Sequence, residues 1–174
     1  LRIGLKTPDV ETGRTPRKEA VSRIGELFDG AGIDYKISNH IESDIWKKYI
    51  LNCAYNVATA HYNNTIGELR SDPVKAKEYE SLVWEAWRVA DAKGVAVTRM
   101  DAEAIIKRFY EELADDATSS LQRDLWQGKP VEIETVSGYL VKEAARLGVE
   151  VPISSRMYEG LKKIASVMRT YAGV

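Results

Sequence analysis

The sequence contains too few cysteines and histidines for a disulfide framework or a Cys/His metal site. Its 174 residues include one cysteine, Cys53, and 2 histidines, His40 and His61. A disulfide needs two cysteines, and structural zinc sites normally take four Cys or His ligands. We therefore expect no metal, and any chemistry must come from Lys, Asn, Ser, carboxylates or a bound cofactor.

The chain also lacks an excess of charge and a long apolar run. It has 25 Lys+Arg against 26 Asp+Glu, a formal charge of -1, so the basic excess typical of nucleic-acid or anionic-membrane binders is missing. No apolar run approaches the roughly 18 residues of a membrane span, and the first residues lack the apolar segment of a secretory signal. We expect a soluble, cytoplasmic protein with no nucleic-acid or membrane partner. The length suits one domain, or one domain plus a fragment of another.

The N-terminal segment predicts a strand, a helix and a second strand. Residues 1–8 (LRIGLKTP) resemble a strand that enters a turn-rich loop. Thr15 and Pro16 predict the N-cap and first position of a helix, whose apolar spacing continues until Gly30. Residues 33–38 (IDYKIS) alternate apolar and polar side chains, as a strand does. A sheet this small cannot stand alone, so it either packs on the helices behind it or ends a larger α/β domain.

The rest of the chain has a helical pattern throughout. Apolar residues recur at helical spacing in segments separated by short Gly, Pro, Asp and Asn breaks. We expect helices near residues 41–60, 73–93, 99–114, 117–126, 132–146 and 154–171. Thr98 and Asp101 have the spacing of a capping box at the start of the third of these. The predicted fold class is therefore mainly α.

The helix predicted from Trp46 to Val57 carries Lys48, Asn52 and Asn56 along one polar stripe. At about 100° per residue these side chains fill a sector roughly 80° wide between two apolar strips. Asn is a mediocre helix former and costs free energy when it is buried without partners, so two on this helix need a reason. From spacing alone, a structural role is as good an interpretation as a functional one: the amides would bond nearby backbone, and Lys48 would reach water.

Other polar and aromatic residues have simpler interpretations. Ser119 and Ser120 are adjacent hydroxyls that either begin a helix or bind an anion, and composition does not separate them. Trp84 and Trp87 lie at helical spacing among apolar residues, which predicts core or interface positions. His61 borders the polar helix and is interpreted as a boundary residue, not as a catalyst.

The ordered set of motifs resembles the C-terminal domain of the ketopantoate reductase family, whose members make pantoate with NADPH. That family carries a W-x-K-x-x-x-N-x-x-x-N helix, a G-E-L segment, an S-M-x-x-D segment, and T-E-I-D followed by a Gly four residues later. The matching residues are Trp46, Lys48, Asn52, Asn56, Gly67 to Leu69, Ser120, Asp124, Glu132, Gly138, Gly148, Val149 and Pro152. The resemblance covers essentially residues 39 to 160.

This resemblance implies a domain organisation. Residues 40–174 would form a mainly α, multi-helix C-terminal dehydrogenase domain of the 6-phosphogluconate dehydrogenase type. Residues 1–39 would be a strand-helix-strand remnant of a Rossmann, dinucleotide-binding domain. No G-x-G-x-x-G occurs in the sequence, so most of the NADPH site is expected outside this chain. We expect a C-terminal portion that folds but cannot turn over alone.

The resemblance also implies the roles of individual residues in reducing a 2-oxo acid, with 2-dehydropantoate as the expected substrate. Lys48 and Glu132 are the expected catalytic residues, and Lys48 would donate the proton and stabilise developing charge. Asn52 and Asn56 would bind hydroxyl and carbonyl oxygens of the substrate, and Ser120 its carboxylate. Glu132 would hold the rotamer of Lys48 or touch the cofactor, unless it only begins a helix.

Two alternatives remain open. The chain is either a reductase portion or a non-catalytic helical module for dimerisation or partner binding, with Trp84 and Trp87 as anchors. Within the enzyme class, a paralogue that reduces another 2-oxo acid is the second alternative. Val131, Leu121 and Glu134 replace the family's Thr, Met and Asp, which puts the substrate in question more than the reaction. The choice between NADPH and NADH is also left open. A homodimer is possible, and the oligomeric state is open as well.

Overall fold

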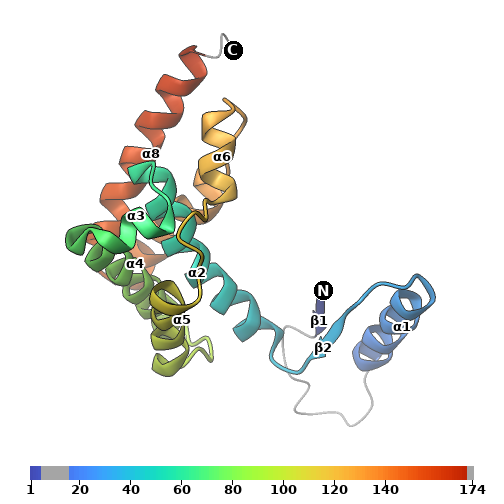
Figure 1. Cartoon of the computed structure of the whole chain (residues 1–174). Helices are drawn as coiled ribbons and strands as arrows, with labels where there is room; N and C mark the ends of the chain where they lie inside the picture. Colours follow the sequence, from blue (N-terminus) through green and yellow to red (C-terminus); the bar gives the residue numbers. More distant parts are fainter. Residues whose placement is uncertain (5–15, 172–174) are drawn as a thin grey trace. The chain divides into compact units, whose positions relative to one another are not determined.

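The computed structural model describes residues 1–4 and 16–171 (Figure 1). Its elements are β1 (Arg2–Gly4), α1 (Pro16–Gly30), β2 (Lys36–Ser38), α2 (Ile41–Tyr62), α3 (Ile66–Ser71), α4 (Pro73–Ala92), α5 (Arg99–Glu111), α6 (Ser120–Trp126), the π-helical turn η1 (Glu134–Gly138), α7 (Tyr139–Leu147) and α8 (Pro152–Tyr171). The predicted mainly α fold class is confirmed. The N-cap predicted at Thr15 lies outside the described residues.

The chain divides into two compact units, Leu1–Trp46 and Lys47–Val174, and each is described by itself. The first holds β1, α1 and β2, and the second holds α3 to α8. Helix α2 begins in the first unit and continues in the second. The domain boundary predicted between residues 39 and 40 stays a prediction.

In the first unit, β1 and β2 form a parallel pair, with Ile3 opposite Ile37 and α1 as the connection between them. The predicted strand-helix-strand order is confirmed. A Cβ on Gly25 would lie 2.6 Å from the hydroxyl of Tyr35, so glycine allows that ring to approach α1. Parallel sheets are normally covered on both faces. Here Ile37 and Leu27 are 54% and 71% exposed, so this unit leaves apolar surface uncovered.

Helix α4 is the centre of the second unit, where it contacts α3, α5, α7 and α8. It buries apolar side chains along its length: Ala76, Tyr79, Leu82, Val83, Ala86, Val89 and Ala90. The ring of Tyr79 stacks on Phe109 of α5 with 3.9 Å between centroids. Each large apolar side chain removed from water contributes about 1.5–3 kcal/mol, so this face holds the unit together.

Glu85 is a charged residue on that buried face, with 2% of its surface exposed. Its carboxylate accepts hydrogen bonds from the backbone N–H of Ile153 at 3.0 Å and of Ser154 at 2.7 Å, and from the Ser154 hydroxyl at 2.6 Å. These donors belong to the first turn of α8, where N–H groups have no partner within the helix. Glu85 therefore caps α8 and joins it to α4.

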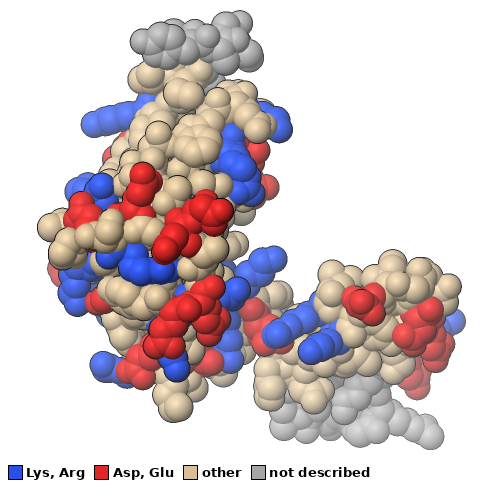
Figure 2. Space-filling model, in the orientation of Figure 1, with Lys and Arg blue, Asp and Glu red and all other residues tan. Residues whose placement is uncertain are grey.

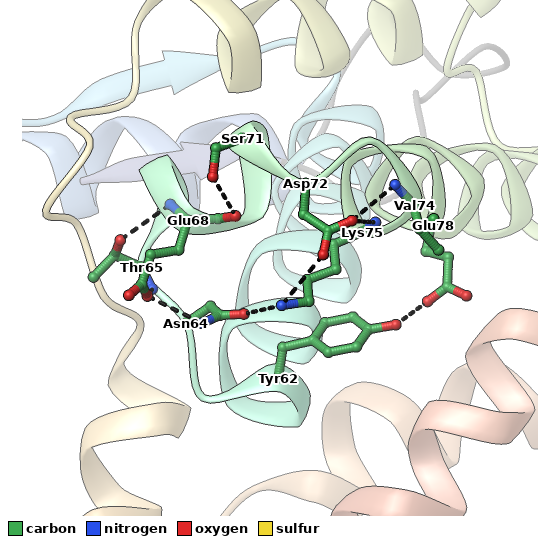
Figure 3. A network of polar contacts seen from close by, with 9 residues as sticks. All are labelled: Tyr62, Asn64, Thr65, Glu68, Ser71, Asp72, Val74, Lys75 and Glu78. Carbon is green, nitrogen blue, oxygen red and sulfur yellow. Dashed lines mark hydrogen bonds and ion pairs between the residues drawn. The ribbon is translucent and has the colours of Figure 1, made fainter.

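A network of caps joins α2, α3 and α4 (Figure 3). Thr65 and Glu68 form a capping box that begins α3. Asp72 ends α3 and accepts hydrogen bonds from the N–H groups of Val74 and Lys75 at 3.0 and 3.2 Å, which begins α4. Sequence periodicity did not predict α3, because its 6 residues are too few to show a helical repeat.

Several predicted helix ends differ from the observed ones; the segment expected as one helix over residues 132–146, for example, is η1 followed by α7. Two of the differences have an identifiable cause. The helix expected over residues 99–114 ends at Glu111, where Arg70 donates hydrogen bonds to the carbonyls of Phe109 at 2.7 Å and Leu113 at 2.8 Å. The helix expected from residue 117 begins at Ser120, because the Ser119 side chain caps it. The first of these ends is contacted by a residue distant in sequence, and the second depends on which of two adjacent serines is the N-cap, so periodicity does not locate them.

The surface shows no segregation of charge by sign over the drawn face of the helical unit. Acidic and basic side chains are interspersed there (Figure 2). Among the described helices, none is both long and apolar enough to cross a membrane.

Candidate functional site

Lys48, Asn52 and Asn56 lie along one side of α2, as the spacing predicts. Lys48 is exposed, and both asparagines are half-buried. In the described part of the chain, none of these three side chains has a hydrogen bond or an ion pair. Their donors and acceptors are thus not used by the fold, in contrast to the structural role in which the amides bond nearby backbone.

The neighbouring lysine is engaged elsewhere. The Lys47 ammonium forms an ion pair with Asp101 of α5 at 2.8 Å. Partial burial raises the pKa of Asp101, but the bonds from Lys47 and from the Thr98 cap outweigh it and lower that pKa below its usual value. Asp101 is therefore ionised and holds Lys47. Of the two adjacent lysines, Lys48 is the one available to bind an anion.

One flank of the stripe contacts the turn η1. The Tyr49 hydroxyl donates to the carbonyl of Val136 at 2.5 Å, and the Cys53 thiol lies 3.9 Å from the same oxygen. Burial raises the pKa of Cys53 to about 12, against the lowering effect of its bond with Tyr49, so it stays a neutral thiol. Glu132 lies four residues before Val136, and its carbonyl accepts the Val136 N–H at 3.1 Å. The Glu132 side chain is exposed.

The opposite flank contacts the segment that begins α6. The Tyr55 hydroxyl donates to the carbonyl of Thr118 at 3.1 Å, and the Thr59 hydroxyl lies 2.8 Å from that of Ser119. Ser119 is buried and accepts the N–H of Gln122 at 3.1 Å as the N-cap of α6. Ser120, by contrast, is exposed. The structure thereby separates the two serines that composition did not.

The arrangement around α2 follows from helical geometry. At about 100° per residue, the directions of Asn52 and Asn56 fall between those of Tyr55 on one side and Tyr49 on the other. The two segments that contact these tyrosines carry Ser120 and Glu132, respectively. The five candidate side chains therefore come from one helix and the two segments that flank its polar side. Lys48 and Glu132 form no ion pair here, so their predicted pairing stays a prediction.

Several motif residues of the resemblance have structural explanations. A Cβ on Gly67 would lie 2.8 Å from that of Asp115, whose carbonyl accepts the Gly67 N–H at 2.8 Å. Glu68 completes the capping box of α3, and Leu69 is fully buried. Gly148 ends α7 with a φ of 69°, a conformation that favours glycine. These positions therefore have roles in the fold.

Two of the positions at which the sequence departs from the family pattern, Leu121 and Glu134, make contacts within the fold. Leu121 is buried. Glu134 accepts a hydrogen bond from the Tyr158 hydroxyl at 2.6 Å and forms an ion pair with Lys142 at 3.0 Å. Tyr158 belongs to α8 and Lys142 to α7. Glu134, which replaces the family's Asp, is therefore engaged in contacts between elements of the fold. Asp124, which matches the family's Asp, is half-buried.

Trp84 and Trp87 have partners within the chain. Their rings meet edge to face with 5.7 Å between centroids, and the Trp87 indole N–H donates to the carbonyl of Val97 at 3.0 Å. The guanidinium of Arg99 lies 5.1 Å from the centre of the Trp84 ring. Both tryptophans are half-buried. They hold the connection between α4 and α5, which gives them a role without a partner protein.

An open depression lies over α3. Its lining residues are Thr65, Gly67, Glu68, Arg70, Ser71 and Asp115. Most of these side chains take part in helix caps or in the Arg70 to Asp115 ion pair at 2.7 Å. None is a candidate site residue.

Thr59, which lies on the same side of α2 as the polar stripe, was not identified from the sequence. Thr59 lies eleven residues after Lys48, which returns it to within about 20° of the same direction on α2. The spacing that identified Lys48, Asn52 and Asn56 therefore includes Thr59 when it is extended by one turn. The sequence alone did not distinguish its partner Ser119 from the adjacent Ser120.

Comparison with known proteins identifies relatives of this chain. Residues 40–165 match the family described as "Ketopantoate reductase PanE/ApbA C terminal". The 2-dehydropantoate 2-reductase of Salmonella typhimurium is 29% identical over 142 residues, which cover 82% of this chain and 46% of that protein. The chain spans about half the length of the curated relatives it matches.

Solved structures give the same result. A PanE/ApbA family ketopantoate reductase from Ralstonia eutropha JMP134 has a TM-score of 0.77 and 28% identity, over 86% of this chain and 49% of that one. A ternary structure of D-mandelate dehydrogenase with NADH and anilino(oxo)acetate has a TM-score of 0.76 over 89% of this chain and 51% of that one. Its identity of 17% shows a shared fold alone. Because the family match spans residues 40–165, well over half of the chain, this chain belongs to the ketopantoate reductase PanE/ApbA family of oxidoreductases and corresponds to its C-terminal domain.

Proposed function

We propose that the protein carrying this chain reduces 2-dehydropantoate to pantoate with NADPH, a step of pantothenate and coenzyme A biosynthesis. The main support is the polar stripe of α2, where Lys48, Asn52 and Asn56 stand at the family's motif positions with side chains that the described fold does not use. Ser120 and Glu132, at two further motif positions, lie in the segments that flank this stripe.

Reduction of a 2-oxo acid needs a hydride on the carbonyl carbon and a proton on the carbonyl oxygen. NADPH supplies the hydride. The Lys48 ammonium donates the proton and stabilises the negative charge that develops on the oxygen. Lys48 is suited to this role because Asp101 engages its neighbour Lys47. Its exposed ammonium can regain a proton from water after each turnover.

The remaining polar groups of the site bind the substrate. The half-buried amides of Asn52 and Asn56 each offer a donor and an acceptor, which suits hydroxyl and carbonyl oxygens. The exposed hydroxyl of Ser120 donates a hydrogen bond to the substrate carboxylate. Because these groups come from two separate elements, α2 and α6, they can hold the two ends of a small acid.

Glu132 has two proposed roles. It pairs with Lys48 once the site is occupied, or it contacts the cofactor. Its exposed side chain has no ion pair in the described part of the chain, so its carboxylate is available for either role. A Glu132→Gln variant separates them: loss of the pairing lowers kcat, whereas loss of a cofactor contact raises the KM for NADPH.

Most of the NADPH site is proposed to lie outside this chain. The parallel strands β1 and β2 with exposed Leu27 and Ile37 fit the edge of a larger doubly wound sheet. The sequence offers no G-x-G-x-x-G turn for the phosphates. We also expect a cytoplasmic protein, because the proposed substrate and cofactor are small molecules of the cell interior. A homodimer stays a prediction, which sedimentation of the complete protein checks.

The test is a steady-state assay of the complete protein. NADPH consumption is measured with ketopantoate and with a panel of other 2-oxo acids, and each is repeated with NADH. We expect the highest kcat/KM with NADPH and ketopantoate, by on the order of tenfold or more over acids that lack its hydroxyl. Preference for another 2-oxo acid would identify a paralogue. No consumption with any acid would refute the reductase.

A further inference from the structure

A buried pair of hydroxyls joins the C-terminal half of α2 to the start of α6. Thr59 is fully buried, and Ser119 is 1% exposed. Their side-chain oxygens lie 2.8 Å apart, within hydrogen-bond distance. The two residues are 60 positions apart in the sequence, so the pair is a tertiary contact between two elements of the candidate site.

The hydrogen bonds of this pair are fully used within the protein. Thr59 Oγ1 also lies 2.7 Å from the carbonyl of Tyr55, one turn earlier in α2. A hydroxyl has one proton, so when Thr59 gives it to that carbonyl, Ser119 supplies the proton of the bond between the hydroxyls. Ser119 Oγ accepts the N–H of Gln122 at 3.1 Å in addition. Neither hydroxyl has a donor left for a ligand.

A second contact fixes the preceding residue. The Tyr55 hydroxyl and the Arg123 guanidinium donate to the carbonyl of Thr118, at 3.1 and 2.7 Å. Thr118 and Ser119 are therefore both tied to one side of α2. The Cα of Ser120 lies one peptide further, about 3.8 Å from that of Ser119. The position and direction of the Ser120 side chain therefore depend on the position of Ser119.

We infer that Thr59 is a positioning residue that sets the Ser120 hydroxyl against the Asn52 and Asn56 amides by holding Ser119. The inference rests on the proposed function, in which Ser120 binds the substrate carboxylate. Helix α2 then carries the Asn52 and Asn56 amides and, through Thr59 and Ser119, also fixes the position of the Ser120 hydroxyl relative to them. Binding groups must be held to within a fraction of an ångström, because a displacement of about 1 Å loses most of a hydrogen bond.

The test compares Thr59→Val with Thr59→Ser in the complete protein, assayed with NADPH and ketopantoate. Valine has nearly the shape of threonine but lacks the hydroxyl, whereas serine keeps it. We expect Thr59→Val to raise the KM for ketopantoate by about 3- to 10-fold, the range of one neutral hydrogen bond, with kcat within about twofold. Thr59→Ser should keep the KM within about twofold of the wild type. An unchanged KM in Thr59→Val overturns the inference.

A double-mutant cycle with Ser120→Ala tests whether Thr59 acts through Ser120. If it does, the double variant has the KM of Ser120→Ala alone, because a lost binding group no longer needs positioning. If the two effects multiply, Thr59 acts by another route and the inference is overturned. Amide exchange gives a second readout: residues 119–122 should exchange faster in Thr59→Val, with α7 unchanged.

Two further variants complete the design. Ser119→Gly also removes the bond to Thr59 but keeps a good N-cap residue, so it should reproduce Thr59→Val and replaces it if that variant does not fold. Glu103→Ala removes an exposed side chain of α5 that pairs only with Arg99, at 3.1 Å, and should leave the KM unchanged. A wild type that does not turn over refutes the proposed function. An active wild type with an unchanged KM in both hydroxyl variants refutes this inference alone.

Discussion

The imidazole ring of His61 occupies the space that a side chain at position 160 would need. A Cβ on Gly160 would lie 2.5 Å from Cε1 and 2.8 Å from Nδ1 of that ring. His61 belongs to the last turn of α2, and Gly160 lies within α8. Glycine is usually unfavourable inside a helix, by about 0.5–1 kcal/mol relative to alanine. Its presence here is explained by the close approach of the two helices.

We predict that Gly160→Ala destabilises the protein although alanine is the better helix former. The added methyl group meets a rigid ring, and overpacking of this kind costs about 1–3 kcal/mol. His61→Ala makes room for the methyl group, so the double variant should be more stable than the sum of the single effects, by on the order of 1 kcal/mol. Urea unfolding of the four proteins measures this. Strict additivity would show that the ring and the glycine do not meet.

His61 also makes stability depend on pH. Burial and then the positive charge of Arg156 lower the pKa of His61, while Glu78 and a backbone bond with Met157 act in the opposite direction without cancelling the shift. Its Nδ1 is buried without a partner, so a proton there would have no acceptor. The unfolded chain titrates near the usual value of about 6.5, and the folded state binds its proton only at lower pH. The contribution of His61 is therefore complete above that value and is lost as pH falls through the folded pKa.

We predict that Tm falls between about pH 7.5 and about pH 5.5, and that His61→Gln flattens this part of the profile. The carboxyl group of Glu78 has its pKa lowered below the usual value of 4.5, so it titrates below this window. Thermal unfolding across the window checks the prediction. A variant profile parallel to that of the wild type would assign the pH dependence to other groups.

Glu85 supports a third prediction. Its buried carboxylate accepts bonds from the Ile153 and Ser154 N–H groups, which would be left without partners in Glu85→Ala. Loss of a charged acceptor that satisfies buried donors costs about 2–4 kcal/mol. Glu103→Ala is the control, because Glu103 is 52% exposed and only pairs with Arg99 at the surface. We expect its effect to be about 0–0.5 kcal/mol in the same denaturation experiment.

Much of the fold could be predicted from local signals in the sequence. The helix expected from Pro16 to Gly30 has those bounds in the structure, and the one expected over residues 73–93 is observed as Pro73–Ala92. In both, a proline marks the first turn, where its missing N–H has no cost. The capping box of Thr98 and Asp101 was likewise expected and is observed. These features depend on neighbours within a few positions.

What could not be predicted depends on contacts between distant residues. Composition did not distinguish Ser119 from Ser120, because what separates them is the contact of Ser119 with Thr59, which lies 60 positions away on another helix. Nor did it show which of Lys47 and Lys48 is engaged, since Asp101 on α5 decides that. The stripe itself followed from helical spacing. The roles of its residues still rest on the family resemblance and on the experiments proposed here.

The two adjacent lysines provide the most direct test of the chemistry. In the complete protein, we predict that Lys48→Ala lowers kcat with NADPH and ketopantoate by about 10²- to 10⁴-fold, the usual range for a lost acid–base group. Lys47→Ala is a matched control, because it removes the same side chain one position away. It breaks only the partly exposed ion pair with Asp101, which is worth about 0–1 kcal/mol, so its kcat should stay within a few-fold of the wild type. Lys48→Arg should keep the positive charge and much of the substrate binding but still lose turnover, because a guanidinium with a pKa above about 12 gives up its proton poorly. Equal losses in the two alanine variants would indicate a general effect on α2, and near-normal turnover in Lys48→Ala would exclude Lys48 as the proton donor.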